Sequence, residues 1–167
     1  MVETIRFDTL IARYGVPFFC KIDIEGHERS CLRALNRATA PRYISIEMSH
    51  TDAGEDIELL RGLGYSRFKI VSQRTRTQSF LPLAELSYAL PSAASNLVRR
   101  ATRKFLGVTQ VGDWRFSSNS SGPFAEDTPG SWKSYDAAMH IWRKLKQFDE
   151  RAKSQGLGDW FDIHAKL

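Results

Sequence analysis

Apolar positions in the first ninety residues alternate between helical spacing and short continuous runs. Residues 7–14 show apolar side chains at i, i+3, i+4 and i+7, which predicts a helix that ends at Gly15. Residues 17–25 form an almost continuous apolar run that turns acidic at its end, typical of a buried strand. The pattern then predicts a helix over 27–36, a strand over 43–48, a helix that stops at Gly64 and a strand over 68–71.

Apolar strands joined by amphipathic helices are typical of a parallel sheet covered by helices on both faces. Right-handed crossovers place successive strands side by side. In such folds, ligands bind at the carboxyl ends of the strands. The predicted strands end in polar or ionisable residues, namely Asp23, Glu25, Glu47 and His50. We therefore expect these four side chains to converge at one edge of the sheet.

The second half of the chain has a different pattern. Residues 84–106 have helical spacing interrupted by Pro91, residues 117–124 form a polar loop, and helical spacing returns over 138–148. The tail at 160–164 has the composition of a packed segment. We therefore divide the chain into an α/β half, residues 1–75, and a helical and loop extension packed on it, residues 76–167.

Composition favours a folded domain. Of 167 residues, 42% are hydrophobic and 26% are charged, which excludes a disordered or collagen-like chain. The longest apolar runs, such as 16–20, are far shorter than the about 20 residues of a membrane span, so no transmembrane segment is expected. Residues 1–6 lack a secretory pattern, and Cys20 and Cys31 lie in apolar contexts. These features predict a cytoplasmic protein with buried thiols.

The chain is basic, with 24 Lys and Arg against 19 Asp and Glu, a formal net charge of +5. Part of the excess is the cluster Arg99, Arg100, Arg103 and Lys104. No exposed aromatic pattern or binding motif accompanies it, so a nucleic-acid partner is not expected. Two interpretations stay open. The cations form a solvated helix face, or they cooperate with an apolar stripe over 94–105 at a membrane surface.

One segment is specific enough to indicate a family. Residues 21–28 read Lys-Ile-Asp-Ile-Glu-Gly-His-Glu, which resembles the Lys-Ile-Asp-Val-Glu-Gly-x-Glu motif of the FkbM-type methyltransferases. The predicted elements on either side of the motif are similar to those of the family, and residues 120–126 and the segment around Trp132 resemble features near the ends of some members. The resemblance is strongest over about residues 5–70.

The resemblance implies a fold and a reaction. The family has a class I, Rossmann-like α/β fold and uses S-adenosylmethionine, so we expect an O-methyltransferase that acts on a hydroxyl of a sugar, glycolipid or polyketide-type acceptor. Asp23 would lie near the transferred methyl group and the acceptor. Glu25 and Glu47 would orient the acceptor hydroxyl or take its proton, and His50 is a weaker candidate for the base. No metal is expected.

Each candidate also has a structural interpretation. Asp23 and Glu25 suit the cap of the following helix, whose amides favour an anion, and Glu47 is simply the polar end of a strand. His27 is interpreted as a surface residue, and Trp142 lies on a helical stripe that predicts burial. His140 and His164 receive no role.

The chain departs from the family pattern in one respect. Class I methyltransferases resemble a doubly wound sheet whose first strand ends in a glycine-rich turn for the cofactor, and no such turn follows a strand here. Cofactor-binding residues therefore stay unassigned, apart from Asp23. The predicted sheet is incomplete, with an exposed edge beside Ile22.

Three explanations of that departure stay open. The chain is the C-terminal part of a longer enzyme, or a second chain or a second copy completes the sheet, or the domain is a non-catalytic remnant with an interaction role. A divalent-metal hydrolase that uses the four polar residues is a further alternative.

Overall fold

The computed structural model describes residues 4–48, 53–73, 75, 77–78, 86, 89–116, 122–153 and 160–167. Its α-helices are α1 (Phe7–Tyr14), α2 (Glu28–Arg33), α3 (Ala53–Gly62), α5 (Ser92–Leu106) and α6 (Tyr135–Lys153), with a 3-10 helix η1 (Ala125–Asp127). Its strands are β1 (Phe19–Ile22), β2 (Tyr43–Glu47), β3 (Arg67–Ser72), β4 (Thr77–Gln78), β5 (Gln110–Val111), β6 (Trp114–Arg115) and β7 (Phe161–Lys166).

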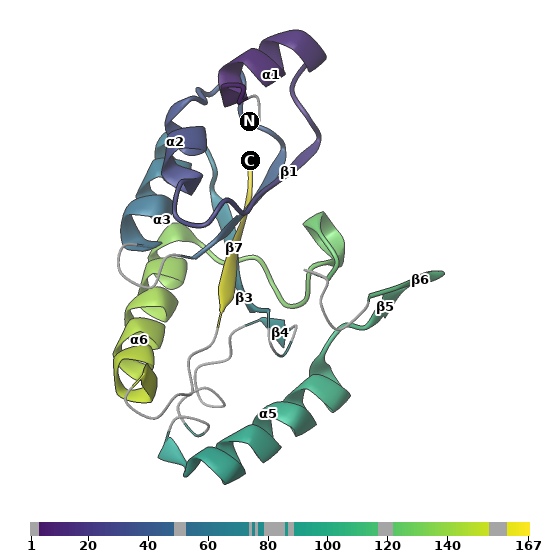
Figure 1. Cartoon of the computed structure of the whole chain (residues 1–167), viewed down its shortest axis with the longest axis vertical. Coiled ribbons are helices and arrows are strands. Elements are labelled where there is room, and N and C mark those ends of the chain that lie inside the picture. Colours follow the sequence, from purple (N-terminus) through teal and green to yellow (C-terminus); the bar gives the residue numbers. More distant parts are fainter. Residues whose placement is uncertain are drawn as a thin grey trace.

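The five-stranded sheet is mixed, in the order β1-β2-β7-β3-β4 (Figure 1). β1 and β2 are parallel, as expected, but β7 runs antiparallel to both β2 and β3 and separates them. The expectation of a parallel sheet with successive strands side by side is therefore wrong at this point. A strand from the end of the chain occupies the place predicted for a direct β2–β3 contact.

β7 explains why the tail has the composition of a packed segment. Five of its six residues are buried, and it hydrogen-bonds to a strand on each side. The alternation in Phe161-Asp-Ile-His-Ala-Lys166 sends apolar side chains to one face of the sheet and polar ones to the other. One central strand of the sheet therefore belongs to residues 76–167, which the sequence pattern assigns to the extension. The description of that extension as helices and loops is incomplete.

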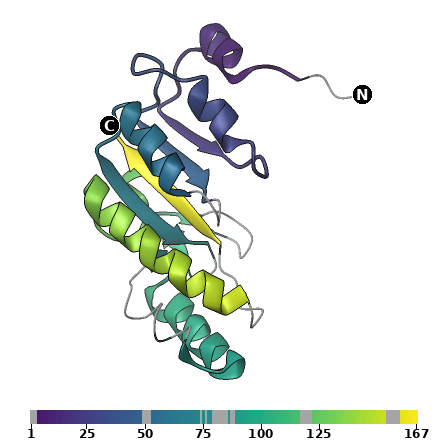
Figure 2. The ribbon, with the colours of Figure 1, turned by 90° about the vertical axis from the view of Figure 1, so that its left-hand side faces the viewer.

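The apolar face of the sheet packs against a helical layer. Four isoleucines lie in one register row across β1, β2, β7 and β3, and each is at most 4% exposed: Ile22, Ile46, Ile163 and Ile70. Helices α2, α3 and α6 lie side by side over this face (Figure 2). α3 and α6 approach closely at Gly54, where an added Cβ would lie 2.9 Å from the ring of Trp142. Trp142 is partly buried against the core, close to the expected burial.

The opposite face is covered differently. Among the described residues, it is the loop of residues 124–132 with its 3-10 turn η1, and not an α-helix, that packs there. Phe124 stacks on Phe19 of β1 with ring centres 4.6 Å apart. Glu126 accepts hydrogen bonds from Tyr43 Oη at 2.8 Å and Trp132 Nε1 at 2.7 Å. The expectation of helices on both faces is therefore replaced by a helical layer and a loop layer.

The β1 edge of the sheet is open. No strand in the described part of the chain pairs with the side of β1 that faces away from β2. Phe18 and Ile24, at the two ends of this strand, are 60% and 44% exposed. The structure thus agrees with the expected exposed edge beside Ile22. Among its described helices, none combines the length and apolar character needed to cross a bilayer.

Candidate functional site

Three of the four predicted site residues meet at one edge of the sheet. Asp23 and Glu25 directly follow β1, and Glu47 ends the neighbouring parallel strand β2. Because parallel strands end at the same edge, their side chains converge. One carboxylate oxygen from each lies within 4.8 Å of the others. His50, the fourth candidate, lies outside the described residues.

The last residue of the sequence motif shapes the turn that carries two of these carboxylates. Glu28 is buried, and its Oε1 accepts hydrogen bonds from the amides of Ile24 at 3.0 Å and Gly26 at 3.2 Å. Glu25 and Gly26 both adopt positive φ angles, 54° and 94°. Positive φ is uncommon for glutamate and costs energy. The bonds to Glu28 hold the turn in this conformation, which presents Asp23 and Glu25 beside Glu47.

This arrangement also bears on the capping interpretation. α2 begins at Glu28, and its N-cap residue is His27, which makes no side-chain capping hydrogen bond. Asp23 and Glu25 therefore lie upstream of the cap position. His27 is exposed, as expected for a surface residue.

Glu47 has the most perturbed carboxyl of the cluster. Partial burial, the charge of Asp23 and a hydrogen bond with that side chain raise the pKa of Glu47 to about 7. The negative charges of Asp162 and Glu25 act in the same direction. A carboxyl with this pKa exchanges its proton near neutral pH, as a general base requires.

A buried ion pair lies behind the cluster. Lys21 Nζ contacts Asp162 at 3.1 Å and Asp23 at 3.4 Å, so one ammonium bridges the exposed cluster and a carboxylate that is 1% exposed. Gln73 Nε2 donates a further hydrogen bond to Asp162 at 2.9 Å. Burial nevertheless raises the pKa of Asp162, against the opposing effect of Lys21. Sequence reasoning missed this pair, since its members are 141 residues apart.

A row of polar residues crosses the same face of the sheet, formed by Lys21, Ser45, His164 and Lys69. Ser45 and His164 are almost fully buried, and among the described residues neither Ser45 Oγ nor His164 Nδ1 finds a hydrogen-bond partner. Burial lowers the pKa of His164 to about 3, and the charges of the two lysines add to this effect. His164 is therefore neutral at physiological pH. Lys69 Nζ donates to the Thr128 carbonyl at 2.5 Å, which ties the row to the loop above it.

The carboxylate cluster has a geometry that suits a hard divalent cation. Among the described residues, Asp23, Glu25 and Glu47 form the one group of three or more such ligands. Exposed acidic groups also cluster without an ion. The divalent-metal hydrolase alternative would use these three carboxylates. The described part of the chain supplies no further ligand beside them.

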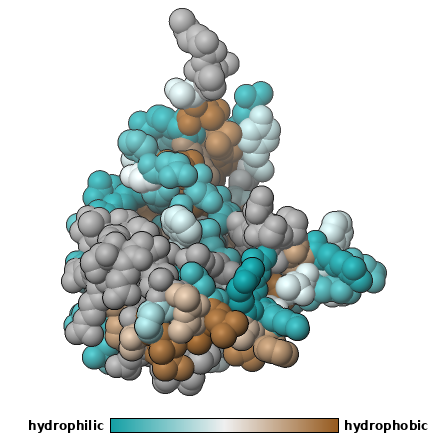
Figure 3. Space-filling model, turned by 60° about the horizontal axis from the view of Figure 1, so that its bottom comes forward, coloured by the Kyte–Doolittle hydropathy of each residue, from teal (hydrophilic) through white to brown (hydrophobic). Residues whose placement is uncertain are grey.

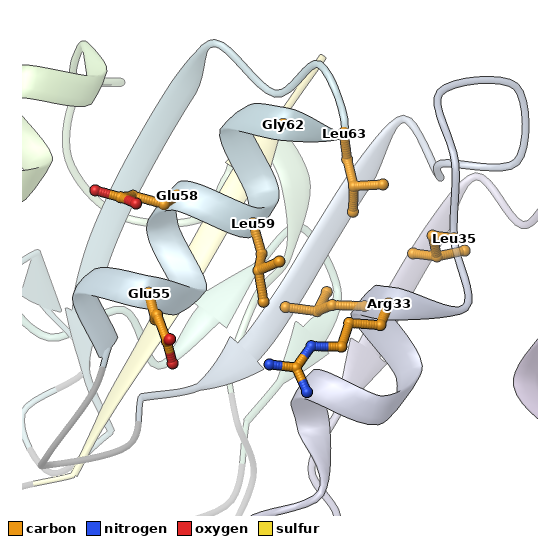
Figure 4. Close-up of a pocket in the computed structure, with 8 residues that line it drawn as sticks. Arg33, Leu35, Glu55, Glu58, Leu59, Gly62 and Leu63 are labelled. Atoms are coloured by element: carbon orange, nitrogen blue, oxygen red, sulfur yellow. The ribbon is translucent and has the colours of Figure 1, made fainter.

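A separate hollow lies in the helical layer. It has a volume of about 500 Å³ between α2 and α3, with Arg33 and Glu55 at its polar end and Leu59 and Leu63 on its wall (Figure 4). None of the three clustered carboxylates lines it. We therefore place the candidate site at the strand ends and not here.

Comparison with known proteins supports the family. Residues 1–67 match the family model described as the methyltransferase FkbM domain. No curated protein and no solved structure matches the chain. The matched range contains the motif, the turn and all three clustered carboxylates. The resemblance to FkbM methyltransferases is thus confirmed over residues 1–67.

Proposed function

We propose that this chain is the acceptor side of an S-adenosylmethionine-dependent O-methyltransferase with a Rossmann-like fold. Two findings together support the proposal. The FkbM domain match covers residues 1–67, and three carboxylates of that range converge where the parallel strands end. The acceptor would be a small molecule or carbohydrate that presents a hydroxyl.

The cluster suits part of the cofactor. S-adenosylmethionine supplies an electrophilic methyl group on a positively charged sulfur, and Asp23, Glu25 and Glu47 place negative charge beside the strand ends. Asp23, which directly follows the motif's strand, is the residue proposed to face that positive charge. The 167 residues contain no glycine-rich turn after a strand to hold the adenosine part. We therefore assign the methyl-accepting side, and not the nucleoside pocket, to this chain.

Glu47 is the proposed base. With a pKa of about 7 it takes up a proton from an acceptor hydroxyl under conditions where an ordinary glutamate would be too weakly basic. Glu25, held at positive φ by the turn, would orient the acceptor through hydrogen bonds. Positioned general-base groups contribute about 10²–10⁴-fold to the rate of such reactions.

The open edge of β1 supports a proposal about partners. An unpaired strand edge is a template for another strand, and exposed Phe18 and Ile24 lie at its ends. We propose that a second polypeptide segment, from another chain or from a longer form of this one, completes the sheet there. Such a segment would also bring the missing nucleoside pocket.

Calorimetric titration of the folded chain with S-adenosylmethionine tests whether it binds the cofactor by itself. A heat of binding that weakens in Asp23→Asn supports the placement of the cluster. If a well-folded sample shows no heat, the chain is not a self-sufficient enzyme. That result fits both the acceptor-side proposal, whose nucleoside pocket lies on a second segment, and a non-catalytic interaction domain, so turnover in an active form decides between them.

Turnover tests the roles of the carboxylates in any active form. We expect Asp23→Asn to lower turnover far more than it lowers stability. We expect wild-type activity to rise with pH through about 7 as Glu47 loses its proton, and Glu47→Gln to lose that limb of the profile. A fully active Asp23→Asn variant would remove that residue from the proposed role.

A further inference from the structure

Helix α5 exposes the side that a surface helix normally buries. Its apolar stripe repeats every four residues, and Leu97 and Phe105 on this stripe are 69% and 75% exposed. Most surface helices turn such a stripe toward the core. α6 of this protein does so, with Leu145 only 1% exposed. The inverted orientation of α5 therefore needs a separate explanation.

The contacts of α5 with the rest of the protein fix this orientation. The helix buries a polar side, where Ser95 is 0% and Arg99 is 6% exposed. At its end, Gly107 lies so close to the chain after β3 that an added Cβ would be 2.5 Å from the Thr75 carbonyl oxygen. Small and polar residues thus hold the helix in place, which leaves Leu97, Ala101 and Phe105 facing outward.

The exposed side of α5 is also cationic. The helix contains no acidic residue. Arg100 and Lys104 are exposed and Arg103 is partly exposed, whereas Arg99 belongs to the buried side. The three arginines and Asn96 line a hollow of about 440 Å³. Lys104 Nζ lies 5.5 Å from the centre of the Phe105 ring. Figure 3 views the molecule from the α5 end and shows apolar side chains gathered beside hydrophilic ones.

We propose that the outer face of α5 binds the surface of an anionic lipid bilayer. Leu97 and Phe105 would enter the boundary between headgroups and acyl chains, and the exposed Arg100 and Lys104 would contact lipid phosphates. Basic helices with an apolar face are attracted to anionic leaflets in this way. A second copy of the chain fits less well, because its α5 would bring further positive charges against the same face. The inference is independent of the proposed methyl transfer.

Co-sedimentation of the full chain with lipid vesicles tests this proposal. Vesicles of phosphatidylcholine alone are compared with vesicles that also contain phosphatidylglycerol. We expect binding only to the anionic vesicles, with a marked loss as salt rises, because screening weakens the attraction to the phosphates. Arg100→Gln with Lys104→Gln should weaken binding about 25-fold, since each cation near a membrane surface contributes about fivefold.

Matched variants separate the apolar and cationic contributions. Leu97→Ser with Phe105→Ser should weaken vesicle binding at least about tenfold. Tyr14→Ser and Arg67→Gln, which alter an exposed aromatic and an exposed cation away from α5, should bind like the wild type. All these side chains are largely exposed or at the surface, so thermal melting should change little and report any folding defect.

Four outcomes would overturn the proposal. The first is no binding to either kind of vesicle, and the second is equal binding to both. The third is binding to the anionic vesicles that survives the α5 variants. If sedimentation velocity instead shows that Leu97→Ser with Phe105→Ser dissociates a dimer, a second copy covers this face and the membrane proposal fails.

Discussion

The two faces of the central sheet are formed by residues adjacent in the sequence, but one face is apolar and the other is polar. On one face the row Ile22, Ile46, Ile163 and Ile70 packs against helices. One residue away, on the other face, lies the row Lys21, Ser45, His164 and Lys69. Side chains alternate between the faces of a strand, and every member of the two rows except the partly exposed Lys21 is buried. The apolar face stabilises the fold through burial alone. The polar face needs partners for its charges, and one of its members, Lys21, contacts Asp23 of the carboxylate cluster.

This difference predicts where single substitutions lower the stability of the protein most. Apolar burial is distributed over many contacts, and each removed methylene costs a limited amount. A buried charge depends on a few specific partners, and losing one leaves the other in a medium that solvates it poorly. The polar face is therefore the place where single substitutions should have the largest effects.

Lys21→Met should be the most damaging of the changes considered. It removes the cation that contacts buried Asp162 at 3.1 Å and leaves that carboxylate with Gln73 as its remaining partner. We expect a loss of about 3–5 kcal/mol in the free energy of unfolding, measured by urea denaturation. Combining Lys21→Met with Asp162→Asn should recover most of this loss. A single variant as stable as the wild type would show that the pair contributes nothing.

Ile163→Ala should rank next, and it probes the apolar face at the same strand. Ile163 is 0% exposed and faces Ile46 and Ile70 on the neighbouring strands. Truncation leaves a cavity between sheet and helices, and we expect a loss of about 2–5 kcal/mol in the same denaturation experiment. Ile163→Val, the milder control, should cost about 0.5–1.5 kcal/mol. Equal effects of the two substitutions would mean that the helices close over the cavity.

Glu47→Gln should have the smallest effect on the free energy of unfolding, and that effect depends on pH. The folded-state pKa of Glu47 is raised from 4.5 to about 7, so the folded state holds this proton more tightly than the unfolded state. Wild-type stability should therefore fall as the pH rises from about 4.5 through 7. Glutamine does not ionise, so the variant should lack this contribution and be more stable than the wild type above pH 7 by about 1–2 kcal/mol, a value reduced by solvent screening.

Thermal or chemical denaturation across this pH range measures the Glu47 contribution. Asp136→Asn, which changes an exposed carboxylate on α6, serves as the control and should keep the wild-type pH dependence. If Glu47→Gln shows the same fall in stability with pH as the wild type, the raised pKa does not belong to this residue.

Local sequence patterns predicted much of the fold. The helix at Phe7–Tyr14 has the predicted bounds and ends at Gly15, which adopts a φ of 86°. The first three strands lie where the apolar runs indicated, with ends shifted by up to three residues. These features depend on periodicity and on stop residues a few positions apart, which a sequence displays directly.

The tail was harder to interpret for a physical reason. Phe161–Lys166 is short, and its alternation suits either a strand or a packed loop. Its partners, β2 and β3, are far away in the sequence, and its antiparallel register with both is fixed by their packing. The buried Lys21–Asp162 pair and the neutral His164 follow from that register, so local patterns carried no signal for them.

The sequence by itself determined the family segment, the positions of the main helices and strands, and the convergence of Asp23, Glu25 and Glu47, because parallel strands end at one edge. The tertiary structure decided which strand fills the centre of the sheet, which carboxyl has the raised pKa, and which side of α5 faces outward. Those properties depend on burial and on charges brought together across long stretches of chain, and no local pattern of residues specifies them.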